Sequence, residues 1–150
     1  MSATIRVATP ADAPAVLDLV EELFDPPGRR PPDYTRERGA AGIHTALQRP
    51  DADVLVAVEG ERLVGFASVY VDFLSIRFGW RCWLQDLVVT AARRSTGVGQ
   101  RLLDVATGWA RARGCTHLEL SSATTRRDAH RFYLAAGMAQ GSLCFSRRIG

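Results

Sequence analysis

A short stretch rich in arginine and glycine, Arg94-Ser95-Thr96-Gly97-Val98-Gly99-Gln100, has the composition of a phosphate-binding loop. It stands between a strand-like run that ends at Val89 and a helix-like run that begins at Val98. Glycines let the backbone bend and approach a ligand closely, and the first turn of a helix offers N–H groups without intrahelical acceptors. Such amides suit a pyrophosphate. The same glycines would also serve an ordinary tight turn, so this motif alone leaves both interpretations open.

Other glycine loops of known chemistry do not match this stretch. A dinucleotide-binding loop requires a third glycine where this chain has Leu102. An ATP-binding loop of the Walker type requires a lysine, and all 19 basic residues of this chain are arginine. A kinase glycine-rich loop belongs to a much longer domain.

Hydrophobic periodicity predicts the elements that must position the loop. Strands are expected at Ile5–Val7, Val54–Val58, Leu63–Val71, Arg81–Val89, His117–Leu120 and Gly141–Arg148, and helices at Ala13–Phe24, Tyr34–Gln48, from Val98 to an end at Gly114, and at Arg126–Ala136. Thr9-Pro10-Ala11-Asp12 has the composition of a cap before the first helix. This order predicts an α/β protein with a mixed sheet, in which the unit from Arg81 to Ser122 forms a parallel strand pair with a right-handed crossover.

The composition is that of a globular chain and excludes several classes of protein. The 150 residues predict a single domain, 1–150. No run approaches the ~18 apolar residues of a membrane span, and the N-terminus lacks a secretory signal, so we expect a cytoplasmic protein without a membrane partner. The net charge of +3 is weak, and the arginines are spread along the chain and interleaved with acids, which disfavours a nucleic-acid partner. The abundance of arginine fits codon bias in a GC-rich genome, and the composition resembles that of a bacterial protein.

The cysteines and histidines do not form a metal-binding pattern. Cys82, Cys115 and Cys144 are far apart and odd in number, which also argues against a disulfide framework. The three histidines are equally scattered. We therefore expect free thiols in a reducing compartment and no metal ion.

A second motif lies on the last predicted helix, where Ala129, Phe132, Tyr133 and Gly137 follow the pattern Ala-x-x-Phe-Tyr-x-x-x-Gly. Together with Arg-x-x-Gly-x-Gly at Arg94–Gly99, in this order, it resembles the GCN5-related N-acetyltransferase (GNAT) family. The resemblance is strong over about Trp83–Gly137. It implies a mixed, mostly antiparallel sheet of six to seven strands with a central splayed parallel pair, flanked by about four helices.

The resemblance also implies acetyl-CoA as cosubstrate. In the family the pyrophosphate binds to the amides of the glycine loop, and the pantetheine arm runs between two diverging strands, here Gln85–Val89 and His117–Ser122. Diverging strands leave N–H and C=O groups that the amides of pantetheine can satisfy. The implied cofactor-binding residues are Leu87, Val88, Val89, Arg94, Ser95, Thr96, Gly97, Val98, Gly99, Gln100, Arg126 and Phe132. Many relatives carry asparagine where this chain has Arg126, which could instead meet a CoA phosphate.

Acyl transfer to an amine requires a polarised carbonyl, a neutral nucleophile and an acid for the leaving thiolate. The backbone N–H of Val88 or Val89 could polarise the carbonyl. The resemblance assigns the acid to Tyr133, whose alternative is aromatic packing beside Phe132. Asp86 could accept the amine's proton through water, or pair with the amine and position it. Alternatively, Asp86 has only a structural role, and a chain of water molecules removes the proton from the amine. Gln85 is predicted to face the opposite side.

The resemblance places the acceptor near two segments, Asp25–Asp33 and Asp72–Trp83. The first could be a semi-rigid lid or a simple connector. Asp72 and Asp86 would suit a cationic amine, and Phe73, Phe78, Trp80 and Trp83 could form an aromatic wall or serve as core. We expect transfer to a primary amine of a small molecule; a peptide or protein amine, or a non-catalytic acyl-CoA sensor, are the alternatives. A homodimer through the last strand or the exposed aromatics is a family-level expectation.

Overall fold

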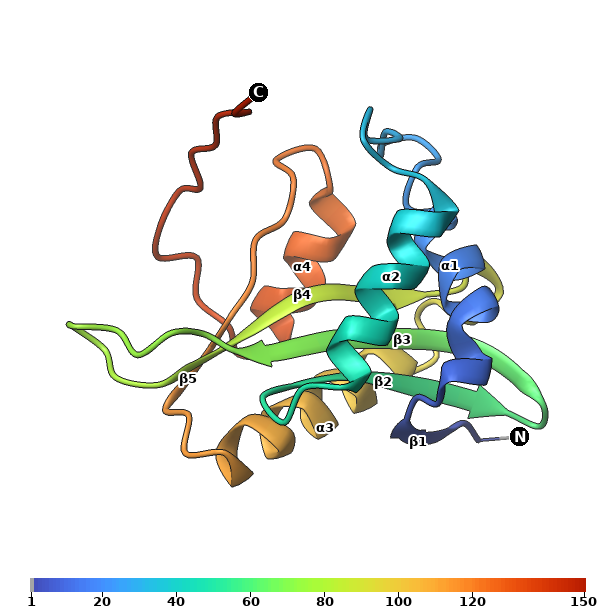
Figure 1. Cartoon of the computed structure of the whole chain (residues 1–150), viewed down its shortest axis with the longest axis horizontal. Coiled ribbons are helices and arrows are strands. Elements are labelled where there is room, and N and C mark those ends of the chain that lie inside the picture. Colours follow the sequence, from blue (N-terminus) through green and yellow to red (C-terminus); the bar gives the residue numbers. More distant parts are fainter. Residues whose placement is uncertain (1) are drawn as a thin grey trace. The chain divides into compact units, whose positions relative to one another are not determined.

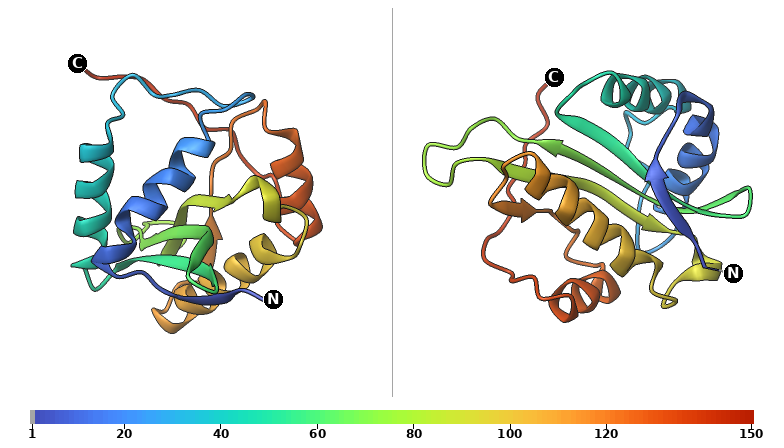
Figure 2. Two further views of the ribbon diagram at one scale, coloured as in Figure 1. Left: turned by 90° about the vertical axis from the view of Figure 1, so that its right-hand side faces the viewer. Right: turned by 90° about the horizontal axis from the view of Figure 1, so that it is seen from below.

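A five-stranded mixed sheet organises the chain up to Leu120 (Figures 1 and 2). The structure is a computed structural model that describes residues 2–150. The strand order follows the sequence, β1-β2-β3-β4-β5; the first four strands pair antiparallel, and β5 pairs parallel to β4. The strands are β1 (Thr4–Val7), β2 (Ala52–Glu59), β3 (Arg62–Val71), β4 (Arg81–Val89) and β5 (His117–Glu119).

Helices cover both faces of this sheet, as Figure 2 shows. Helices α1 (Ala13–Glu22) and α2 (Arg36–Leu47) lie on one face, and α3 (Val98–Ala112) lies on the other. The first core contains Val16 and Leu17 of α1 with Phe66 of β3 and Val88 of β4. On the other face α3 packs closely against β3 at Gly65. A Cβ atom added to Gly65 would lie only 3.1 Å from Leu102 of α3. β4 is therefore buried between two layers of helices.

The predicted cap before α1 is confirmed and is reinforced from β1. The Thr9 N–H donates to Asp12 at 2.7 Å, and Arg6 of β1 forms an ion pair with the same carboxylate at 2.7 Å. These contacts hold the pKa of Asp12 at about 2, chiefly through the Arg6 hydrogen bond. The start of α1 is thus tied to the edge of the sheet.

Residues Ser121–Gly150 form a second compact unit that contains helix α4 (Arg127–Ala135). The sequence predicts a helix over Arg126–Ala136 that ends at Gly137, and the structure agrees to within one residue at each end. Gly137 has a φ of +88°, and the Met138 N–H donates to the Tyr133 carbonyl at 3.0 Å. This is the glycine-terminated end that the motif predicted.

The prediction of six to seven strands is wrong, because the described residues form five. The difference is the predicted strand Gly141–Arg148, which has neither helix nor strand structure. Its alternation of apolar and polar residues is typical of a half-buried strand, but a strand forms only when it pairs with a neighbour. Here Leu143 and Phe145 are 71% and 88% exposed. The mixed sheet and the four helices are confirmed.

Residues 2–150 contain neither a membrane-spanning helix nor a cluster of metal ligands. No helix in this range is both long enough and apolar enough to span a membrane. No group of three or more histidine, cysteine, aspartate or glutamate side chains lies close enough there to hold a metal ion. The cysteines are free; Cys82 is buried and Cys144 is exposed.

Candidate active site

The glycine loop lies at the junction that the sequence predicts, between the end of β4 and the start of α3. A turn of 3-10 helix at Ala91–Arg93 follows Thr90, and Arg94 is extended. Ser95 then has a φ of +62°, and Gly97, the residue that caps α3, has a φ of +92°. A residue with a side chain adopts such angles only at a cost, so Gly97 is required for this turn.

Six consecutive backbone N–H groups of this loop, at residues 95–100, have no hydrogen-bond acceptor within residues 2–150. The first helical bond from this region is donated by Arg101 to the Gly97 carbonyl, at 3.1 Å. Ser95, Thr96 and Gly97 are exposed. The amides therefore combine with the positive end of the α3 dipole in a concentrated site for an anion.

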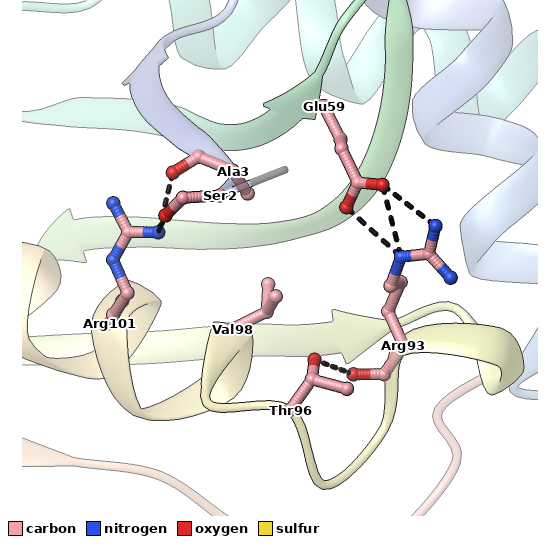
Figure 3. A pocket seen from close by; sticks show the side chains of 7 residues that line it. All are labelled: Ser2, Ala3, Glu59, Arg93, Thr96, Val98 and Arg101. Atoms are coloured by element: carbon pink, nitrogen blue, oxygen red, sulfur yellow. Dashed lines mark hydrogen bonds and ion pairs between the residues drawn. The ribbon is translucent and has the colours of Figure 1, made fainter.

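A pocket of about 340 Å³ beside the loop shows how it is anchored (Figure 3). Arg93 donates to both carboxylate oxygens of Glu59 at 2.7–3.2 Å, and the Thr96 hydroxyl donates to the Arg93 carbonyl. On the other wall Arg101 donates to Ser2 and Ala3. Arg93 is thus paired with a carboxylate, and Arg101 is held by the neutral groups of Ser2 and Ala3, so both arginines help to anchor the loop.

Arg94 is also engaged, at the end of β4. Its Nε donates to the Val89 carbonyl at 3.2 Å, and its guanidinium lies 4.0 Å from Glu22 of α1. Glu22 also accepts from the Thr90 hydroxyl at 2.9 Å and from the Ala91 N–H at 3.1 Å. Glu22, which no sequence motif indicates, thus joins the end of α1 to the start of the loop.

The edge of β4 that faces β5 is open over its second half. The parallel ladder pairs Arg81–Trp83 with His117–Glu119 and ends there. On the opposite edge, Thr90 donates to Val64 of β3, and antiparallel strands alternate in the direction of their N–H groups. The N–H of Val88 therefore points toward β3, while those of Leu87 and Val89 point toward the open edge. Of the two predicted carbonyl donors, this register favours Val89.

A β-bulge in β4 determines where Asp86 points. Val69 pairs with Leu84, and the next residue of β3, Ser68, pairs with Asp86, so Gln85 is the extra residue. A bulge shifts the alternation of side chains by one. Asp86 consequently lies on the same face as Val88, toward α1 and α2, and Gln85 is exposed.

Asp86 is a partly buried carboxylate whose hydrogen bond comes from Ser68. The Ser68 hydroxyl donates to its Oδ2 at 3.0 Å. Burial raises the pKa of Asp86 above the ordinary aspartate value, and the Ser68 hydrogen bond lowers it in part. A carboxyl group with a raised pKa is typical of functional sites. Ser68 was missed by the sequence analysis, although it is a single polar residue within an apolar strand.

The remaining predicted site residues, Arg126, Phe132 and Tyr133, lie in the second unit. Arg126 caps α4, with a φ of −87° and a ψ of 65°. Phe132 and Tyr133 are partly buried, and their rings meet edge to face with centroids 5.4 Å apart. The roles of these three residues stay predictions.

The predicted acceptor region is only partly brought together. A cavity of about 590 Å³ is lined by Asp72, Phe73 and Trp80 near the β3–β4 connection, together with Arg113 of the α3 end and the α2–β2 loop. Trp83 and Asp86 do not line it, so the four aromatic residues do not form one wall. Segment 25–33 has no regular structure, and Arg30 stacks on Tyr34 at 4.9 Å from its ring centre.

Comparison with known proteins gives consistent results for sequence and fold. Residues 14–138 match the model of the acetyltransferase (GNAT) family. The aminoalkylphosphonate N-acetyltransferase of Salmonella typhimurium is 32% identical over 145 residues, covering 97% of this chain and 90% of the relative. An aminoglycoside N(6')-acetyltransferase of Klebsiella aerogenes is 38% identical over 152 residues, covering 93% and 91%. The solved structure of aminoglycoside N-acetyltransferase AAC(6')-Iy with CoA superposes with a TM-score of 0.84 at 17% identity, covering 97% of this chain and 94% of that one.

Proposed function

The chain belongs to the acetyltransferase (GNAT) family and is an N-acetyltransferase, and on this premise we propose that it acetylates a primary amine of a small molecule. The amine would attack acetyl-CoA directly, with both substrates bound at once. One observation carries the proposal: within residues 2–150, six consecutive N–H groups have no acceptor, and the loop that holds them follows the half of β4 that β5 does not pair and on which Asp86 lies. Because the matched residues extend into both compact units, we infer that residues 1–150 act as one acetyltransferase domain.

The residues of the loop and of β4 fit a CoA thioester. The amides of residues 95–100 would hold the pyrophosphate, since they have no acceptor among the described residues, 2–150. The open edge of β4 would hold the pantetheine arm through backbone groups of Leu87 and Val89. Val88 and Val98 would contribute backbone and apolar contacts, and Arg126 and Phe132 are proposed to contact the cofactor from the second unit. When bound, acetyl-CoA supplies an acetyl group that is already activated as a thioester.

Three groups of this chain would then perform the proton and charge chemistry. The Val89 N–H would donate to the carbonyl that becomes negative as the amine attacks. Asp86 would bind the acceptor's ammonium group or take its proton, directly or through water; if it only binds, water molecules leading to solvent are the base. Tyr133 would hold the proton that the departing sulfur takes up.

The names of the relatives support a small-molecule acceptor over a peptide amine. The Salmonella relative is named for aminoalkylphosphonates and the Klebsiella relative for aminoglycosides. Both classes are amines of low molecular weight. Segment 25–33 is proposed as a lid over the acceptor.

Turnover with a panel of amines tests the proposal. The protein is incubated with acetyl-CoA and with aminoalkylphosphonates, aminoglycosides, polyamines, amino acids or a peptide, and mass spectrometry detects the acetylated product. Product detection is preferable to a thiol reagent, because the exposed Cys144 would react with such a reagent. We expect acetylation of at least one small amine. Binding of acetyl-CoA without any product would instead identify a sensor, and acetylation of the peptide alone would identify a protein acetyltransferase.

We also propose the partners and the compartment that the sequence predicts. A homodimer would bury exposed apolar residues such as Leu143, Phe145 and Ile149, and light scattering during gel filtration would detect it. Arginines such as Arg6 and Arg36 are engaged in ion pairs, which supports the absence of a nucleic-acid partner. Free cysteines agree with a reducing cytoplasm.

A further inference from the structure

Ser68 and Asp86 form a pair that neither residue's sequence context reveals. They lie directly opposite each other on β3 and β4, at the point where the bulge begins. The Ser68 hydroxyl donates to Asp86 Oδ2 at 3.0 Å, and this is the hydrogen bond found for that carboxylate within residues 2–150. Oδ2 is thus occupied, and Oδ1 has no donor in the part of the chain that the structure describes.

Among the described residues, 2–150, no charged group pairs with this carboxylate. The elements packed against β4 carry these titratable groups: Asp18, Glu21 and Glu22 on α1, Arg62 and Tyr70 on β3, Arg101, Asp104 and Arg111 on α3, and His117 and Glu119 on β5. Tyr70 lies on the same face of β3 as Ser68. Glu22 is bound to Thr90 and Ala91, and Glu119 to Arg81. On the opposite face of β4, Cys82 is buried toward α3. Only burial and the Ser68 hydroxyl perturb the pKa of Asp86.

We propose that Ser68 is a positioning residue for acetyl transfer, whose hydroxyl fixes the Asp86 carboxylate so that Oδ1 faces the acceptor's ammonium group. This inference rests on the proposed role of Asp86. A carboxylate held by one hydroxyl on a rigid sheet keeps one orientation, whereas without that bond it rotates and is more readily protonated. Ser68 does not itself touch the reacting atoms; it acts through Asp86.

The experiment compares the pH profiles of kcat/KM for Ser68→Ala and Ser68→Thr with the wild-type protein. Loss of the hydroxyl removes the bond that lowers the pKa of Asp86, so the acidic limb of the Ala variant moves to higher pH. We expect Ser68→Ala to lose about tenfold or more in kcat/KM at neutral pH, in the range of one hydrogen bond to a charged group. Ser68→Thr keeps the hydroxyl and suits a strand, so it retains the wild-type profile. The ionisation of the amine is common to all variants and does not contribute to the difference.

A double variant separates this inference from the proposal on which it rests. In an Asp86→Asn background the carboxylate is absent, so Ser68→Ala should cause less than a twofold further loss. An equal loss in both backgrounds, or an unshifted acidic limb in Ser68→Ala, would overturn the positioning role alone. Wild-type activity of Asp86→Asn would overturn the role of Asp86 itself, and the inference with it.

Discussion

Ser95 offers a direct test of the anion site, because its backbone already favours the two substitutions that the test requires. It is exposed and has a φ of +62°, a region in which asparagine and aspartate are more stable than serine. Ser95→Asn and Ser95→Asp should therefore both fold as well as the wild type. The Asp variant should gain a further 0.3–1 kcal/mol or so, since its charge lies near the positive end of α3.

The two variants should differ sharply in cofactor affinity. A carboxylate at about 7 Å from a phosphate charge costs roughly 0.6–2.4 kcal/mol, for an effective dielectric constant between about 80 and 20. Because the loop is exposed to solvent, the lower half of that range applies to each charge. A pyrophosphate carries two such charges, so the repulsion counts twice. The expected loss is about 10- to 100-fold in affinity for acetyl-CoA. Ser95→Asp is thus expected to stabilise the fold and weaken binding at the same time.

Isothermal titration calorimetry of both variants at about 50 mM and about 300 mM NaCl measures this difference. The ratio of the two Kd values isolates the charge, because asparagine and aspartate have nearly the same shape. The ratio should shrink at the higher salt concentration, as screening reduces the repulsion. Equal affinities at low salt, with both variants folded, would show that the pyrophosphate does not bind at these amides.

Three further substitutions test the remaining chemistry and the scaffold. Tyr133→Phe should lower kcat about 10²-fold with an unchanged KM for acetyl-CoA, and full activity in steady-state kinetics would assign the leaving-group proton elsewhere. Asp86→Asn should unfold at a higher urea concentration than the wild type at pH 7. The reason is that burial raises the pKa of Asp86, so the wild-type folded state loses stability as the pH rises through that pKa. The extra stability of the variant should vanish at pH 3, where the carboxyl is protonated. Asp12→Asn should lose about 1–2 kcal/mol of unfolding free energy at pH 6, a figure discounted because Arg6 is exposed. Because the pKa of Asp12 in the folded state is about 2, the difference from the wild type should shrink as the pH falls from about 4 to 2. A difference that persists at pH 2 in urea unfolding would contradict the ion pair.

Features that depend on neighbouring residues were predicted well from the sequence. The bounds of β4, Arg81–Val89, are those predicted, and α3 and α4 begin and end within two residues of the prediction. Each is defined by a local signal, an apolar run or a terminal glycine. The loop at residues 94–100 belongs to the same group, because its turn requires Gly97 and its free amides follow from the start of a helix.

Features that depend on pairing between distant segments were not predicted. The bulge at Gln85 exists only in the register of β4 against β3, and no property of either strand alone indicates it. Glu22 and Ser68 act on residues that lie far away along the chain, at Thr90 and Asp86. The strand prediction for Gly141–Arg148 was wrong for the same reason, since a strand pattern does not indicate whether another strand is available to pair with it.

This division explains why the cofactor could be predicted and the acceptor could not. The amides that would bind a pyrophosphate lie within six consecutive residues, so a short motif contains the whole site. The carboxylate proposed for the amine is aimed by a bulge, held by β3 and placed on the face of the sheet against which α1 packs, so three segments must be placed before its surroundings exist. Substitutions in β3 or α1 can therefore alter the acceptor side while the loop keeps its conformation. Relatives that share the glycine motif are expected to share a cofactor more often than an acceptor.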